Sequence, residues 1–285
     1  MIGSDANGDL VVVTGASSGI GAATARELAG RGFHVIAGVR REEDAEAIRG
    51  PRIEPIILDI TVPEHVARLA KRVSGDRLRA IVNNAGVGAN APVEVFDLDA
   101  WRRLFEVNYF GHIAVIQRLL PILIRNKGRI VNISSVGGRI AMATYGPYAG
   151  AKFALEALSD SLRRELAPLG VEVVIIEPGA VQTKISARAI ATANDVALKM
   201  SPEQRERYAD LIRAVTTQAA EADEAGLPAD KAARVIAEAI TRRRPRTRYG
   251  VGREAALIGF LRILPDRLVD RLLAAVLRRY VRKSA

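Results

Sequence analysis

Cysteine is absent from the 285 residues, and histidine, methionine and tryptophan are rare. Without cysteine the chain has no disulfide framework and no thiolate metal site, which is compatible with a reducing compartment. The three histidines, His34, His65 and His112, have no ligand-like spacing, so we expect no metal site and interpret each as a packing or surface residue.

Long apolar runs and a recognisable amino-terminal signal are also missing. The best candidate run, residues 113–124, is interrupted by Gln117, Arg118 and Pro121, whereas a membrane-spanning helix needs about 18 apolar residues. The opening MIGSDANGDL lacks the basic and apolar regions of a secretory signal. We therefore expect a cytoplasmic protein.

Basic charge is unevenly distributed. The formal net charge is +10, but 13 Lys and Arg and only 3 Asp and Glu lie from Arg242 onward, which leaves 29 basic and 29 acidic residues before it. The positive charge therefore belongs to one carboxyl-terminal element, so we do not expect a nucleic-acid-binding fold.

Hydrophobic residues make up 49% of the chain, enough for a sizeable core, and one α/β domain is ordinary at this length. Short apolar runs alternate with helical segments. The first helical segment ends at Arg31, and the next ones span 62–74, 98–125 and 146–168. This alternation predicts a Rossmann-type, doubly wound parallel sheet covered on both faces. The predicted strands are 10–14, 33–39, 52–59, 79–83, 128–134 and 171–179.

After residue 183 the pattern changes. Residues 186–223 are polar and helical, a helix is predicted at 229–243, and TRYGV is the expected last strand. Two more helices, 253–264 and 266–282, complete the chain. We predict a single domain over residues 1–285, with a helical insertion at 184–228 and a basic amphipathic tail at 251–285.

The segment TGASSGIG, residues 14–21, lies between the first strand and the first helix. Gly15, Gly19 and Gly21 remove side chains where the backbone must approach a phosphate, and the helix amino terminus attracts its charge. The spacing differs from the common G-x-G-x-x-G, and an ordinary tight turn is the alternative interpretation.

The end of the second strand reads GVRREED and bears on the choice of nicotinamide cofactor. NAD sites usually have an acidic residue here, whereas Arg40 or Arg41 could pair with the 2′-phosphate of NADP. We predict NADP(H), with NAD(H) as the alternative because Glu42 or Glu43 could replace that acid. Both arginines could also be solvated residues that open a helix.

Tyr148 and Lys152 stand four residues apart on a predicted helix and share a face. A free tyrosine has a pKa of about 10, and a nearby ammonium, helped by a cationic nicotinamide, would lower it. Tyr148 could then act as general acid or base. Pro147 suits a first helical turn, which places Tyr145 in the preceding loop, where it could line a substrate cleft.

Five motifs stand in order between residues 9 and 184: TGASSGIG, NNAG, VNYFG, ISS with the downstream YAGAK, and PGAVQT. In order and spacing the chain resembles the short-chain dehydrogenase/reductase family. The resemblance implies that Ser135, with Ser134 as its alternative, holds the substrate carbonyl oxygen. It also implies that Asn108 supports a water linking Lys152 to solvent, which is compatible with a helix-bending role.

The resemblance also implies contacts to the cofactor along the carboxyl edge of the sheet. Asp59 is expected to contact the adenine. For Asp59, and for the loop that begins at Pro178 and Gly179 (the PG loop), the alternative is that these residues only shape a turn. The implied cofactor residues are Gly15, Ser17, Ser18, Gly19, Ile20, Gly21, Arg40, Asp59, Ile60, Asn83, Ala85, Gly86, Tyr148, Lys152, Pro178, Gly179, Val181 and Thr183.

The segment after the PG loop covers the substrate in this family, so we expect an apolar lid. Its apolar residues could equally form a helix-packing stripe. They are Ile185, Ile190, Val196, Leu198 and Met200.

The tail, RTRYGVGREAALIGFLRILPDRLVDRLL, resembles steroid and retinol dehydrogenase-like members. In its last helix Arg267, Arg271, Arg278 and Arg282 share one face, opposite an apolar half. This pattern fits packing on the lid or a partner subunit, or peripheral contact with an anionic membrane.

Together these features predict an NADP(H)-dependent oxidoreductase that interconverts a carbonyl and an alcohol on a small apolar substrate, steroid-, retinoid- or fatty-acyl-like. An NAD-dependent alcohol dehydrogenase is one alternative. A non-catalytic, nucleotide-sensing or membrane-associated protein on the same scaffold is another. By resemblance we expect a homodimer or homotetramer formed through helices 98–125 and 146–168.

Overall fold

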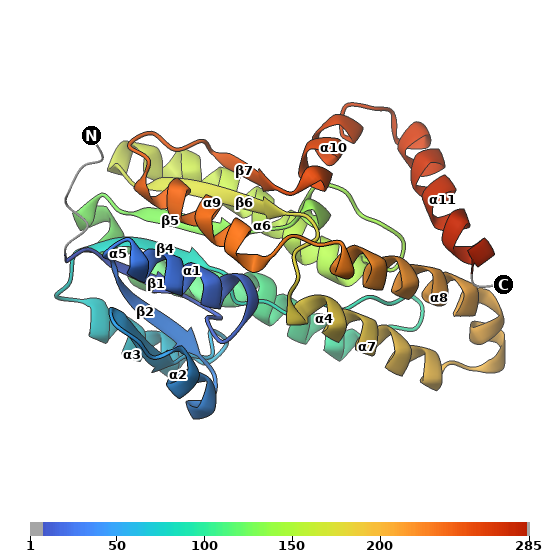
Figure 1. Ribbon diagram of the computed structural model, residues 1–285, viewed down its shortest axis with the longest axis horizontal. Coiled ribbons are helices and arrows are strands. Elements are labelled where there is room, and N and C mark those ends of the chain that lie inside the picture. Colours follow the sequence, from blue (N-terminus) through green and yellow to red (C-terminus); the bar gives the residue numbers. More distant parts are fainter. Residues whose placement is uncertain (1–7, 284–285) are drawn as a thin grey trace.

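The structure, a computed structural model, describes residues 8–283. Its centre is a sheet of seven parallel strands in the order β3-β2-β1-β4-β5-β6-β7 (Figure 1). The predicted fold class is confirmed. The strands are β1 (Leu10–Val13), β2 (His34–Val39), β3 (Ile53–Ile57), β4 (Leu78–Asn83), β5 (Arg129–Ile133), β6 (Glu172–Pro178) and β7 (Arg248–Val251).

Both faces of the sheet are covered, which explains why the strands are almost continuously apolar. In β1, Leu10 and Val12 point into one core and Val11 and Val13 into the other. Helices α1 and α9 pack on one face, and α3, α5 and α6 on the other. These helices are α1 (Gly19–Gly30), α3 (Pro63–Val73), α5 (Gly111–Asn126), α6 (Gly146–Leu166) and α9 (Ala229–Thr241).

The strand order reverses between β1 and β4. From β1 the chain adds β2 and β3 on one side, and from β4 it adds β5, β6 and β7 on the other side. In a parallel sheet such a reversal opens a crevice beyond the carboxyl ends of the strands, and ligands bind there. The glycine loop after β1 and the NNAG loop after β4 flank this reversal. A short helix, α2 (Glu42–Ile48), follows β2 directly.

Helix α4 (Leu98–Phe105), a π-helical turn η1 (Glu106–Phe110) and α5 run on as one helix, Leu98–Asn126, of 29 residues. By length and composition this helix could cross a membrane. In the fold it is a core helix, because Val115, Leu119 and Leu123 are fully buried against the sheet.

The segment predicted to be helical at 186–223 forms two helices, α7 (Lys184–Lys199) and α8 (Pro202–Glu224). The break follows from its residues. Ser201 caps α8, its hydroxyl accepting from the backbone of Gln204 while the Gln204 side chain accepts from the Ser201 backbone, and Pro202 occupies the first turn.

The tail forms α10 (Arg253–Leu261) and α11 (Asp266–Lys283), which extend from the body of the molecule (Figure 1). Helix α11 packs against α8. Arg267, Arg271 and Arg278 are exposed, as the helical pattern predicts, whereas the side chain of Arg282 lies outside the described residues.

Candidate functional site

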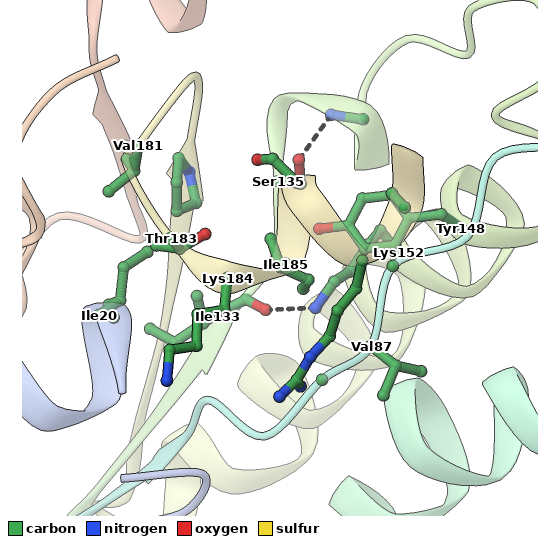
Figure 2. Close-up of a pocket in the computed structure, with 18 of the residues that line it drawn as sticks. Ile20, Val87, Ile133, Ser135, Tyr148, Lys152, Val181, Thr183, Lys184 and Ile185 are labelled. Atoms are coloured by element: carbon green, nitrogen blue, oxygen red, sulfur yellow. Dashed lines mark hydrogen bonds between the residues drawn. The ribbon is translucent and has the colours of Figure 1, made fainter. Parts of the chain in front are cut away.

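A cavity of about 450 Å³ opens at the carboxyl edge of the sheet, at the reversal between β1 and β4. Its walls come from the loops after β1, β2, β3, β4, β5 and β6, from α6, and from α7, α8 and α10. Figure 2 shows the part of the cavity around Ser135, Tyr148 and Lys152. All the residues predicted for the site line this cavity except Gly21, Asn83 and Asn108.

The glycine loop has the backbone that its sequence predicts. Gly15 and Gly19 have φ values of +65° and +54°, in the left-handed region that favours glycine. A Cβ on Gly15 would lie 2.7 Å from Cα of Ala85. The side chain of Ser18, the N-cap of α1, makes no capping bond, so the first N–H groups of α1 are available to an anion beside the loop.

Gly21 serves packing and does not face the cavity. A Cβ there would lie 2.3 Å from the carbonyl oxygen of Gly15 and 2.4 Å from Nδ2 of Asn84. This glycine lets α1 approach the loop closely, and the contact of Gly21 with a cofactor stays a prediction.

The two arginines after β2 differ. Arg41 is held by helix α2, because its guanidinium donates to both carboxylate oxygens of Asp44, at 2.9 and 3.1 Å. Arg40 is exposed and lines the cavity, whereas Glu42 and Glu43 do not. Arg40 and Lys184 therefore both bring positive charge to this end of the cavity, and neither glutamate lines it.

Asp59 lies beside Arg40 at the same end. Burial raises the pKa of its carboxyl, but hydrogen bonds from the hydroxyl and the backbone of Thr61, together with the charge of Arg40, outweigh burial and lower it. Asp59 therefore carries a negative charge and shapes this loop. Ile60 lines the cavity next to it.

The NNAG loop places its two asparagine side chains differently, and the contact of Asn83 with a cofactor stays a prediction. Asn83 is fully buried, and its Nδ2 donates to Oδ1 of Asn132 at 2.8 Å, inside the sheet. The residue that lines the cavity is Asn84, whose side chain donates to the carbonyl oxygens of Thr14 and Gly15. Thr14 in turn accepts from the backbone N–H groups of Asn84 and Ala85, which ties the two loops together.

Both Ser134 and Ser135 line the cavity, but only the Ser135 hydroxyl lies close enough to Tyr148 to affect its pKa. Ser135 Oγ accepts from the backbone N–H of Gly137 at 3.0 Å, as Figure 2 shows. Ser134 is buried with its hydroxyl against Gly138. Strand alternation thus separates the two neighbouring serines.

Tyr148 and Lys152 lie on one face of α6, with the Lys152 Nζ 5.7 Å from the centre of the Tyr148 ring. Burial raises the pKa of Tyr148 to about 12, although the hydrogen bond from Ser135 opposes it. Burial also lowers the pKa of Lys152 to about 8, and the ammonium donates to the carbonyl oxygen of Ile133 at 2.8 Å (Figure 2). The expected lowering of the Tyr148 pKa by Lys152 is corrected for the protein alone: burial dominates.

Asn108 sits in the π-helical turn η1, fully buried. Its Oδ1 accepts from the backbone N–H of Val87, and its Nδ2 donates to the carbonyl oxygen of the same residue, both at 2.8 Å. Asn108 therefore holds the loop after β4 through a helix irregularity. The water-linking role implied for Asn108 stays a prediction.

The loop after β6 forms a further wall of the cavity, next to the glycine loop. Pro178, Gly179, Val181 and Thr183 all line it, and a Cβ on Gly19 would lie 3.0 Å from Cγ2 of Thr183. The loop after β6 thus lies directly against the glycine loop.

Only part of the predicted apolar lid faces the cavity. Ile185 lines it, as Figure 2 shows. Met200 is buried in a separate cluster with Ile212, and Leu198 is 79% exposed. Met200 therefore serves helix packing, as the alternative interpretation predicts. Leu198 neither packs in a core nor lines the cavity.

The long-range walls of the cavity were not predicted. Lys184 and Arg188 of α7, Gln218 of α8, and Glu254 and Ile258 of α10 all line it. The sequence contains no local motif for these residues, because only the packing of the insertion and tail on the sheet brings them there. Lys184 is close enough to Asp44 to lower the pKa of that carboxyl, after the larger effects of Arg41.

The histidines serve structure. His65 Nδ1 accepts from the backbone N–H of Asp59 at 3.0 Å, His34 pairs with Glu54, and His112 is fully buried. Burial, followed by the charge of Lys152, lowers the pKa of His112 to about 3. Within residues 8–283 no group of three His, Asp or Glu side chains could hold a metal ion.

Comparison with known proteins adds three similarities over most of the chain. Residues 9–194 match the family model described as short chain dehydrogenase. The chain is 32% identical to an NADPH-dependent 3-dehydrocapnine reductase from Ornithobacterium rhinotracheale, over 96% of this chain and 99% of that one. It is 37% identical to retinol dehydrogenase 5 from Mus musculus, over 94% and 89%.

Solved structures are similar as well. A short chain dehydrogenase/reductase from Burkholderia phymatum in complex with NAD superposes with a TM-score of 0.72 at 25% identity, covering 86% of this chain and 89% of that one.

Proposed function

Because the chain belongs to the short-chain dehydrogenase family and is therefore an oxidoreductase by descent, we propose that it interconverts a carbonyl and an alcohol on an apolar substrate with NADP(H). One observation carries this proposal. The hydroxyls of Ser135 and Tyr148 lie close together and stand with Lys152 on one wall of a cavity whose far end holds Arg40.

The residues divide the chemistry between them. A phenol with a pKa of about 12 keeps its proton at neutral pH, so Tyr148 can donate that proton to a carbonyl oxygen during reduction. Ser135, held by the Gly137 N–H, can donate a hydrogen bond to the same oxygen. In oxidation Tyr148 would have to be a phenolate, which would take the proton of the alcohol hydroxyl and become a phenol again, while Ser135 would hold the substrate oxygen by a hydrogen bond.

The cavity fits a dinucleotide. The glycine loop and α1 would hold the pyrophosphate, Thr183 would close over it, and Arg40 would meet a 2′-phosphate. When bound, the nicotinamide would supply or accept a hydride. NADP(H) is favoured because Arg40 lines the cavity while Arg41 is hydrogen-bonded to Asp44, and because a relative is NADPH-dependent. NAD(H) is the alternative, since a similar structure binds NAD.

An apolar substrate fits the remaining walls. Val87, Ile140, Met142, Ile185 and Ile258 line the cavity around the reactive hydroxyls. A retinol dehydrogenase among the relatives agrees with this chemistry. The alternative of a non-catalytic protein on this scaffold is disfavoured, because Asn108, Ser135, Tyr148 and Lys152 are all retained.

The direct test replaces Tyr148 with phenylalanine. We expect Tyr148→Phe to bind NADPH as the parent protein does, measured by fluorescence titration. Its turnover of apolar ketones and aldehydes should fall by about a hundredfold or more, because the general acid is gone. Tyr145→Phe is the matched control, since Tyr145 lines the cavity next to the hydroxyls and should keep most of the turnover. Full activity of Tyr148→Phe would contradict the proposal.

A further inference from the structure

The apolar half of α11 is divided between two surroundings. Val269, Leu273 and Leu277 are partly buried on the side where α11 packs against α8. A second stripe one turn apart, Leu268, Leu272 and Val276, is exposed by 41%, 42% and 42%. Packing on the lid therefore accounts for one part of the apolar half and leaves the other in contact with solvent.

Helix α10 is divided in the same way. Glu254 and Ile258, one turn apart, line the cavity. Leu257, Phe260 and Ile263, in and just after this helix, are exposed by 58%, 57% and 76%. The tail thus presents large apolar side chains outward from both of its helices, and α10 separates these side chains from the cavity.

Positive charge accompanies this surface. Arg267, Arg271 and Arg278 are exposed on α11 at positions next to the apolar stripe, and Arg262 is exposed at the end of α10. Residues 253–285 hold 8 Lys and Arg and 3 Asp and Glu, a net charge of +5, whereas the chain before Arg242 is neutral. Net positive charge and exposed apolar side chains therefore coincide on the tail.

From this coincidence we propose that α10 and α11 form a docking surface for an anionic lipid bilayer. Leu257, Phe260, Leu268, Leu272 and Val276 would enter the interface, and the arginines would contact the lipid phosphates and carboxylates. A second copy of the chain is the less suitable occupant, because a symmetric contact would place two tails of like charge together. Docking would bring the α10 wall of the cavity beside the bilayer.

The test is flotation of the full chain with vesicles. We expect the protein to float with phosphatidylcholine vesicles that contain phosphatidylserine, to stay behind with phosphatidylcholine alone, and to be released by salt. The double variant Arg271→Glu/Arg278→Glu should bind about thirtyfold more weakly or worse. The triple variant Leu268→Ser/Leu272→Ser/Val276→Ser should lose about tenfold or more.

The matched control, Arg68→Glu/Lys71→Glu, makes the same charge change on exposed positions of α3, far from the tail in Figure 1, and should bind within about threefold of the parent. Thermal unfolding and NADPH binding check that every variant is folded. Failure of the parent to float with anionic vesicles overturns the proposal, as does equal loss in the control. A change of solution mass in the triple variant, measured by light scattering, with vesicle binding unaltered would identify a second copy as the occupant.

Discussion

Lys152 illustrates how burial sets the behaviour of single residues in this site. Its ammonium is buried and donates to the Ile133 carbonyl, and burial lowers its pKa from 10.5 to about 8 although Glu156 opposes this. A cation with a lowered folded pKa destabilises the fold below that pKa. This destabilisation is fully present below pH 8. The free energy of unfolding rises between pH 8 and pH 10.5, because in that range the unfolded chain still holds a proton that the folded chain has released.

Lys152→Met should therefore be more stable than the parent at pH 7, by about 1–3 kcal/mol, while losing turnover. The gain should shrink between pH 8 and pH 10.5. Urea unfolding at several pH values measures both. A constant difference across that range would show that packing, and not the charge, determines the change.

Arg40 decides the cofactor in our proposal. Arg40→Asp removes the cation and adds a charge that repels a 2′-phosphate, so the NADPH/NADH ratio of kcat/KM should fall by about thirtyfold or more. Arg41→Asp is the control with the same charge change, because Arg41 is bound to Asp44 away from the cavity. Equal shifts in both variants would mean that general charge, and not this contact, sets the preference.

Residue roles could be predicted where a motif and strand alternation agree. They favoured Ser135, whose hydroxyl affects the pKa of Tyr148, and they placed Tyr145 before the helix and Tyr148 on it. They did not reveal that the Asn83 side chain turns into the sheet while Asn84 lines the cavity. The pKa of Tyr148 was predicted in the wrong direction for the protein alone, since burial has no signature in a four-residue spacing.

At the scale of elements, α6 carries the reactive pair and is joined to β6 and β7 by a partly buried cluster of charged side chains. Arg248 of β7 contacts Glu156 at 3.1 Å and Asp160 at 2.9 Å, both on α6, and Glu177 of β6 at 3.2 Å. Burial, then the charge of Glu156, raises the pKa of Glu177, so the carboxylates here depend on their cations.

Arg248→Met should lower the free energy of unfolding by about 3 kcal/mol at pH 8, because it leaves buried carboxylates with too little compensation. These carboxyls would then have raised folded pKa values. When these carboxyls are protonated they do not destabilise the fold, and the destabilisation appears as the pH rises and they ionise. The loss in free energy of unfolding should therefore be smaller at pH 5 than at pH 8. Arg26→Met, at an exposed position of α1, is the control and should change stability by less than about 0.5 kcal/mol. Equal losses at both pH values would contradict this account.

Strands and covering helices could be predicted because buried parallel strands are continuously apolar and the helices between them are periodic. The charge cluster of Arg248 could not, since it joins residues about ninety positions apart along the chain. The break between α7 and α8 had a local signal, the Ser201-Pro202 pair, which the helical composition of the segment concealed.

For the whole molecule, we propose self-association through α5 and α6, as the resemblance to the family implies. Phe110, next to α5, and Phe153 on α6 are 50% and 42% exposed, and such aromatic side chains are typical of an interface core. We expect the parent to be a dimer or tetramer by analytical ultracentrifugation, and Phe153→Arg to shift it toward monomer.

Leu198→Arg is the control for that measurement, since Leu198 is the more exposed side chain but lies on the lid helix α7. The parent's assembly state should survive this change. A monomeric parent, or an assembly that tolerates Phe153→Arg, would rule out this interface.

Because all seven strands run in the same direction, the two edges of the sheet have different roles. The described chain begins just before β1, at the amino edge of the sheet, while the cavity, lid and tail lie beyond the carboxyl edge (Figure 1). An attachment made at the amino-terminal side would therefore leave the cavity mouth and the tail facing outward. Protein immobilised in this orientation could capture vesicles and turn over substrate in the same chamber, so that the two activities are read from one layer of molecules.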